Sequence, residues 1–125
     1  MPRTKLVYYT EDDGTVPIHE WLAGLPRKAS VKCLVYLGRL EAEGHALRRP
    51  ISDLLRDGIH ELRPSLAGVH YRILYFFHGN EAVVVSHGLV KKRSVPAPEI
   101  ERAIERMQRF RRDPRGHTFV PPGGE

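Results

Sequence analysis

The chain has 125 residues, 41% of them hydrophobic and 28% charged, and 20 Lys and Arg residues against 15 Asp and Glu residues give it a formal net charge of +5. Its single cysteine, Cys33, excludes a disulfide scaffold and a cysteine-ligated zinc site, and the chain contains neither a signal-peptide core nor an apolar run of the roughly 20 residues that cross a membrane. We therefore expect one cytoplasmic globular domain with an anionic partner, either nucleic acid or an acidic protein segment.

The first half of the chain predicts one strand followed by two helices. Residues 6–9 are a short β-prone run and predict the strand. Helical spacing of apolar residues predicts a short helix over residues 17–23 and a longer one over residues 26–43. The longer helix carries two apolar stripes, so we expect a broad apolar face that packs on the core. The stripes are Val31, Leu34, Val35 and Gly38, and Cys33, Leu37 and Leu40.

The second half predicts a three-stranded antiparallel meander and a last helix. Residues 45–58 are expected to be a connecting piece that packs on the core. Runs rich in β-branched and aromatic residues predict strands at 59–63, 69–78 and 81–89. The last helix is expected from near Pro98 to Arg112. Its apolar stripe is Ile100, Ala103, Ile104, Met107 and Phe110.

This order of elements, β-α-α-β-β-β-α, predicts an α+β fold in which a small antiparallel sheet is flanked by helices. Residues 1–112 form the expected single domain. Residues 113–125 are rich in Pro, Gly and Arg, and we expect them to be a flexible basic tail.

The hairpin between the two long strands predicts which side chains share a sheet face. If Gly79 and Asn80 are the two loop residues, Arg72 lies opposite His87, and the end of the face that carries this pair stays open. The last helix is expected to cover the apolar middle of that face, while the opposite face packs on the first two helices. The apolar middle is Leu74, Phe76, Val83 and Val85.

These positions suggest a metal-independent RNA-cutting site, which needs cations for the phosphate and groups that transfer protons. Arg72 with Lys91 and Lys92 is the candidate phosphate clamp, and His87 is the candidate for proton transfer. Each candidate also has a purely structural interpretation. Arg72 can form an ion pair with Glu61. Lys91 and Lys92 can lie in a solvated basic loop, and His87 can be an ordinary sheet histidine. The seven His residues show no paired metal-ligand spacing, so neither a metal nor a cofactor is expected.

Four segments carry a family resemblance: "DGTVPIHEWLAGLP", "GIHELRPS", "VHYRILYFF" and "HGLVKKRSVPAPEIERAIER". Together they resemble the phage-derived Gp49-like, HigB-like branch of the RelE/ParE toxin superfamily, from about Lys5 to Arg112. The resemblance implies the toxin of a type II toxin–antitoxin pair that cuts mRNA on the ribosome and pairs with a helix-turn-helix antitoxin. It also implies the RelE-like fold.

The resemblance assigns roles to individual residues. The sheet arginine of the family falls on Arg72 and its basic residue after the last long strand on Lys92, with Lys91 and Arg93 beside it. Arg63 matches an arginine at the end of the preceding strand. Ile59 and Glu61 stand where RelE has lysines, and residues 94–96 stand where its late catalytic tyrosine would follow. His87 is therefore the candidate for the proton-transfer role.

Two other functions stay open at this point. One is a ParE-like inhibitor of DNA gyrase, which shares the fold and lacks the ribonuclease residues. The other is a non-toxic binding module of the same fold. The leading hypothesis is the ribosome-dependent endoribonuclease, with Arg72, Lys92 and His87 as catalytic residues and Arg63, Lys91 and Arg93 as RNA-binding residues.

Overall fold

The computed structural model describes residues 4–122, and its long elements follow the predicted order. Within that range no helix is long and apolar enough to cross a membrane. The helices are α1 (Pro17–Ala23), α2 (Arg27–Glu43) and α3 (Ala97–Arg112), with 3₁₀ turns at Gly44–Ala46 and Arg115–His117. The strands are β1 (Lys5–Tyr9), β2 (Ser52–Arg56), β3 (Ile59–Leu62), β4 (Ser65–Leu66), β5 (Val69–His78), β6 (Ala82–Lys91) and β7 (Thr118–Phe119).

The strands form one sheet in the order β2-β3-β5-β6-β1-β7, and the short β4 pairs with β5. The meander β2-β3-β5-β6 is antiparallel, whereas β1 pairs with β6 in parallel. The α+β class and the predicted antiparallel meander are confirmed, and β1 adds one parallel neighbour that the sequence did not predict. A parallel neighbour needs a long crossover, and the chain supplies one because α1, α2 and four strands separate β1 from β6.

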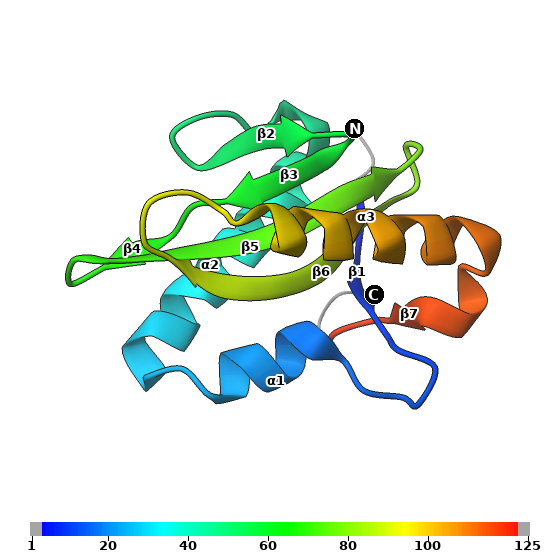
Figure 1. Ribbon diagram of the computed structural model, residues 1–125, viewed down its shortest axis with the longest axis horizontal. Coiled ribbons are helices and arrows are strands. Elements are labelled where there is room, and N and C mark those ends of the chain that lie inside the picture. The colour runs from blue at the N-terminus through cyan, green and yellow to red at the C-terminus, as the bar shows by residue number, and fades with distance from the viewer. Residues whose placement is uncertain (1–3, 123–125) are drawn as a thin grey trace.

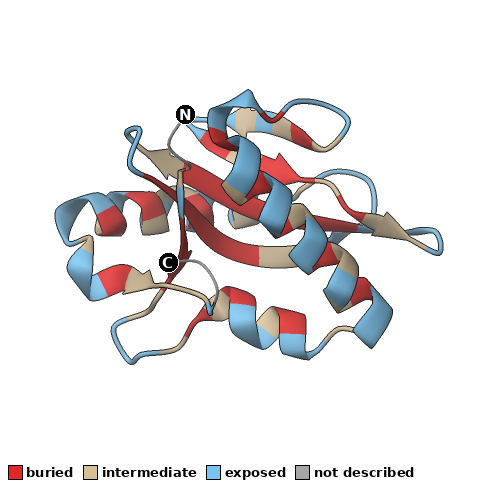
Figure 2. Cartoon of the chain, turned by 180° about the vertical axis from the view of Figure 1, so that it is seen from behind, coloured by how far each residue is buried: buried red, intermediate tan, exposed pale blue. Residues whose placement is uncertain are grey.

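Helices cover both faces of this sheet (Figure 1). One apolar cluster joins α1 and α2 to one face, and a second joins α3 to the other. Viewed from behind, the central strands are largely buried while the outward turns of the helices are exposed (Figure 2). The predicted α3 stripe is confirmed, because Ile100, Ala103, Met107 and Phe110 are buried and the half-buried Ile104 packs against the same cluster.

Only one of the two apolar stripes of α2 faces the core. Cys33, Leu37 and Leu40 are buried. The other stripe is in solvent, because Leu34 is 49% exposed and Val35 is 57% exposed. The prediction of one broad buried face is therefore wrong: the stripes lie on opposite sides of the helix.

The hairpin register also differs from the prediction. His78 pairs with Ala82, so the loop has three residues, and a β-bulge at Ser86 adds a second shift. Arg72 consequently lies opposite Leu89, and His87 lies opposite Leu74. The two shifts together keep Arg72 and His87 on one face. They also move Val83 and Val85 to the opposite face, where both side chains pack toward α1 and α2.

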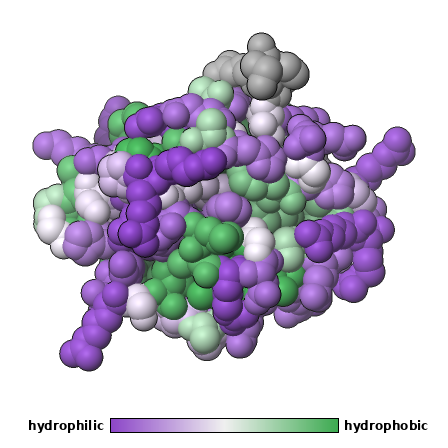
Figure 3. Space-filling model, turned by 90° about the horizontal axis from the view of Figure 1, so that it is seen from above, coloured by the Kyte–Doolittle hydropathy of each residue, from purple (hydrophilic) through white to green (hydrophobic). Residues whose placement is uncertain are grey.

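Two segments that were expected to be irregular are strands. Residues 52–56, expected as a connecting piece, form β2 at the sheet edge, where Leu54 is 57% exposed. Seen from the β2 side, the surface is mainly hydrophilic with separate hydrophobic patches (Figure 3). In the expected flexible tail, residues 115–119 instead pack on the domain: β7 pairs with β1, and the His117 ring stacks on Tyr9.

Candidate functional site

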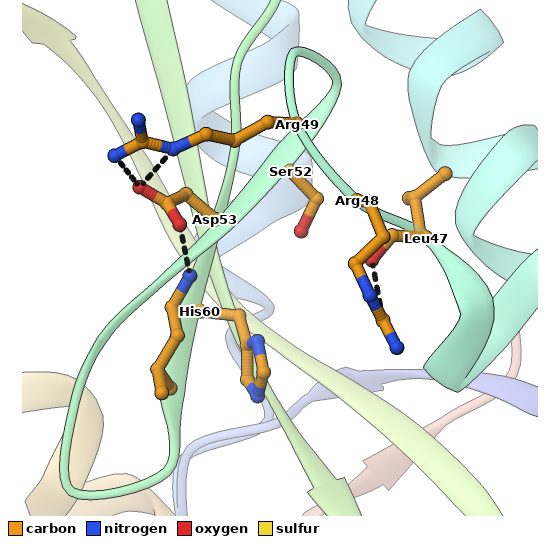
Figure 4. Close-up of a pocket in the computed structure, with 7 residues that line it drawn as sticks. Leu47, Arg48, Arg49, Ser52, Asp53 and His60 are labelled. Carbon is orange, nitrogen blue, oxygen red and sulfur yellow. Dashed lines mark hydrogen bonds and ion pairs between the residues drawn. The ribbon is translucent and has the colours of Figure 1, made fainter.

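A chain of alternating charges crosses the sheet from its β2 edge to β5. Arg49 donates two hydrogen bonds to Asp53 Oδ2, at 3.0 and 2.7 Å (Figure 4). The same carboxylate oxygen lies 3.9 Å from Arg63 Nη1, which donates to Glu61 Oε2 at 2.9 Å. Glu61 Oε1 lies 3.3 Å from Arg72 Nε. Three guanidinium groups therefore share two carboxylates, and the network keeps a net charge of +1.

Arg72 is buried, which contradicts the expectation that its end of the face stays open. Its side chain is only 4% exposed, and Nη1 donates a hydrogen bond to the Tyr71 carbonyl at 2.8 Å. Burial lowers the pKa of the guanidinium, and the charge of Glu61 opposes that shift. The ion pair with Glu61 that the sequence offered as a structural alternative is thus present.

Glu61 holds two arginines at once. Its Oε1 faces Arg72 and its Oε2 accepts from Arg63, so one buried carboxylate fixes the relative position of two guanidinium groups. The lysine that RelE has at this point would repel both. Glu61 therefore acts as a positioning residue for a pair of cations.

Arg63 and Arg72 both line a cavity of about 300 Å³ between α2 and β5. Ser65 Oγ and His70 Nδ1 are 2.8 Å apart on its wall. None of the described residues that line it is acidic, so the cavity favours an anion. The lining residues are Lys32, Tyr36, Pro50, Ile51, Arg63, Ser65, His70 and Arg72. We call this the basic cavity.

The predicted basic residues at the end of β6 begin with Lys91, next to a strand residue that lines the basic cavity. Lys91, the last residue of β6, is the cross-strand partner of His70. Lys91 is half-buried, whereas Lys92 and Arg93 are exposed in the connection to α3. The basic surface therefore continues from the cavity wall onto this connection.

His87 lies outside the basic cavity, beneath the start of α3. Its Nε2 is 3.0 Å from Glu99 Oε1 and its Nδ1 is 2.8 Å from Ser86 Oγ. Burial, and then the charge of Arg106, lowers the pKa of His87 to about 4 although Glu99 acts in the opposite direction. His87 is therefore a neutral, enclosed imidazole at pH 7. The expectation that it sits at an open end of the face is wrong, because α3 covers it.

This burial predicts an acid-sensitive fold. The unfolded His87 takes up a proton near pH 6.5, whereas the folded one does so only near pH 4. The contribution of His87 to the stability of the fold is therefore fully present above pH 6.5. As the pH falls from 6.5 to 4, the free energy of unfolding decreases by up to about 1.4 kcal/mol per pH unit. Urea unfolding across this range measures it, and His87→Asn is expected to flatten the slope. An unchanged slope in the variant would contradict the assignment.

Four polar residues of the basic cavity were not among the predicted site residues: Lys32, Tyr36, Ser65 and His70. The first two come from α2, and only tertiary packing brings them to β5. Ser65 lies on β4, which the sequence did not predict. His70 carried one usable signal, because it lies two residues before Arg72 on the same strand.

A second cavity, of about 510 Å³, lies at the β2 edge (Figure 4). In it the Arg48 guanidinium donates back to the carbonyls of His45 and Leu47, and Arg49 is paired with Asp53. Both arginines of this cavity therefore already donate hydrogen bonds to other groups of the chain. Among residues 4–122, no three His, Cys, Asp or Glu side chains gather as metal ligands.

Comparison with known proteins identifies the family. Residues 20–108 match the family described as phage derived protein Gp49-like, and these residues include β2–β6, most of α3 and the whole basic cavity. No curated protein matches the chain. Because the match covers more than half of the sequence, the chain belongs to the Gp49-like phage-derived protein family, which is part of the RelE/HigB-like toxin group.

Proposed function

We propose that the protein is the toxin of a toxin–antitoxin pair and that it cleaves mRNA on the ribosome without a metal ion or a cofactor. Membership of a toxin-like family supports the general role and an antitoxin partner. The observation that carries the enzymatic proposal is the basic cavity, where Arg63 and Arg72 are fixed by Glu61 next to Lys32 and His70. Translated mRNA is the proposed substrate, so the protein acts in the cytoplasm.

The cations of the cavity would bind the scissile phosphate. Arg72 is desolvated and already positioned by Glu61, so it loses little solvation and little side-chain freedom when charge develops on the phosphate. Arg63, directly after β3, and Lys32, on α2, add further positive charge. Lys91 and Arg93 would then hold the flanking RNA backbone.

His70 is a better candidate than His87 for the proton that leaves the 2′-hydroxyl. His70 is exposed, and the contact of Nδ1 with Ser65 orients the ring so that Nε2 would meet the substrate. As the 2′-oxygen bonds to phosphorus, its proton passes to His70 and the bond to the 5′-oxygen breaks. We assign the proton that returns to the leaving 5′-oxygen to Lys92, which the resemblance places among the catalytic residues.

A comparison of the two histidines tests this assignment. His70→Gln is expected to lower the cleavage rate of a translated mRNA on purified ribosomes by about 10²–10⁴-fold, because it removes a proton acceptor. His87→Gln is the matched control and should stay within tenfold of the unmodified chain. If His87→Gln abolished cleavage while His70→Gln did not, proton transfer would belong to His87.

We also propose that the antitoxin is a helix-turn-helix protein, as the HigB-like resemblance implies. The test is coexpression of the neighbouring reading frame with this chain. Rescue of growth together with copurification supports the pairing, and growth arrest that persists in the presence of that protein contradicts it.

A further inference from the structure

The outward side of α2 carries an apolar stripe that nothing in residues 4–122 covers. Val31, Leu34 and Val35 are 51%, 49% and 57% exposed. Gly38 and Ala42 continue the stripe and are exposed as well. We call these five residues the outer stripe. We propose that it is the docking surface for an acidic amphipathic helix of a partner protein.

The spacing of the outer stripe is that of a helix–helix seam. Its members recur at intervals of three, one, three and four residues, so they share one face over about three turns. The buried stripe of Cys33, Leu37 and Leu40 lies on the other side of the same helix. A helix that is apolar on two opposite sides is suited to contacts on both.

The middle of the outer stripe is hollow. A Cβ placed on Gly38 would meet no atom within 4 Å, so a partner backbone could approach closely there. Beside it is a cavity of about 160 Å³. Its lining consists of Leu34, Leu37, Gly38 and Glu41 from α2, Leu6 and Tyr8 from β1, and Pro121 and Pro122. An apolar side chain from the partner helix would enter this cavity.

Charge indicates the chemistry of the partner. Lys28, Lys32 and Arg39 follow one border of the outer stripe at helical spacing, and Arg27 lies at its N-terminal end. Of these, Arg39 pairs with Glu43 at 2.8 Å. This border therefore keeps a positive charge, whereas Glu41 lies at the other border. A partner helix with Glu or Asp along one side of its apolar residues complements this arrangement.

The same charges disfavour a second copy of this chain. A two-fold symmetric, antiparallel pairing of α2 with itself brings identical borders together, so Lys28 and Lys32 would face the basic border of the other copy. An acidic partner helix meets no such repulsion. The proposal depends only on α2 and does not require that the chain cleaves RNA.

The test uses a designed helical peptide with Leu at helical spacing and Glu along the flank that meets Lys28 and Lys32. Fluorescence anisotropy should show saturable binding to the full chain that weakens with salt, and a peptide with Lys in place of Glu should not bind. Leu34→Asp should weaken binding at least tenfold. Leu54→Asp on β2, which replaces a leucine that is 57% exposed, is the matched control and should have no effect.

Three results would overturn the proposal: no binding of the Glu peptide, equal binding by the Leu34→Asp variant, or equal binding of the Lys peptide. Light scattering supplies a separate check. A dimer of the unmodified chain that Leu34→Asp converts to a monomer would make the outer stripe a self-interface instead. Because Leu34 is half exposed, circular dichroism and thermal unfolding of the variant should match those of the unmodified chain.

Discussion

Replacing Arg72 by methionine is expected to lower mRNA cleavage by about 10²–10³-fold, because it removes a preorganised guanidinium at the proposed phosphate site. Methionine fills a similar volume, so the buried space stays occupied. The measurement is the cleavage rate of a translated mRNA on purified ribosomes. Arg56→Met, which replaces an exposed arginine of β2, is the matched control and should leave that rate unchanged.

The Arg72 variant also separates catalysis from folding. Glu61 keeps its hydrogen bond from Arg63 when Arg72 is removed, so its charge stays partnered. We therefore expect a folded Arg72→Met protein that still binds its antitoxin. Arg72→Lys keeps the charge without the planar guanidinium and should recover part of the rate. Full cleavage by a stable Arg72→Met variant would remove Arg72 from the site.

Replacing Glu61 by alanine is expected to destabilise the fold by about 3–5 kcal/mol, since it leaves the buried Arg72 without its ion-pair partner. Urea unfolding measures this change. Asp53→Ala is the matched control: its closest partner, Arg49, is 75% exposed in its side chain, so the loss should be below about 1 kcal/mol. Equal losses for the two variants would contradict the role of Glu61.

A double variant tests whether Glu61 and Arg72 act as one unit. If they do, Glu61→Ala combined with Arg72→Met should cost less stability than the two single changes added together, because the second change removes the charge that the first leaves unpaired. The results for the Arg72 and Glu61 variants together show whether Arg72 contacts the substrate or only stabilises the fold. Only contact with the substrate predicts that Arg72→Met loses cleavage while it stays folded.

Local sequence patterns were sufficient to predict most of the long elements. The stripe of α3 and the apolar side chains on both faces of β5 follow helix and strand periods that burial then confirms. The short strands β2, β4 and β7 escaped prediction because two to five residues of pairing leave little periodic signal. Both stripes of α2 have helical periodicity, but periodicity indicates only that a side of the helix is apolar and not what covers it.

The site was less predictable than the fold, because it depends on tertiary contacts. The bulge at Ser86 has no marker such as glycine at that position, yet together with the three-residue loop it places His87 opposite Leu74 rather than Arg72. The burial of His87 follows from where α3 begins, and Lys32 reaches the basic cavity only through helix packing. The pairing of Arg72 with Glu61, by contrast, was one of the alternatives that the sequence offered.

Mapping of mRNA 5′ ends after brief induction of the chain, in a bacterium that lacks the antitoxin, tests the proposed activity most directly. We expect new ends at a fixed position within codons, confined to translated regions, and their absence when Arg72→Met is induced to the same level. Growth arrest without new ends, accompanied by DNA breaks, would contradict the ribonuclease and indicate a gyrase inhibitor. Normal growth with the folded chain present would contradict toxicity itself.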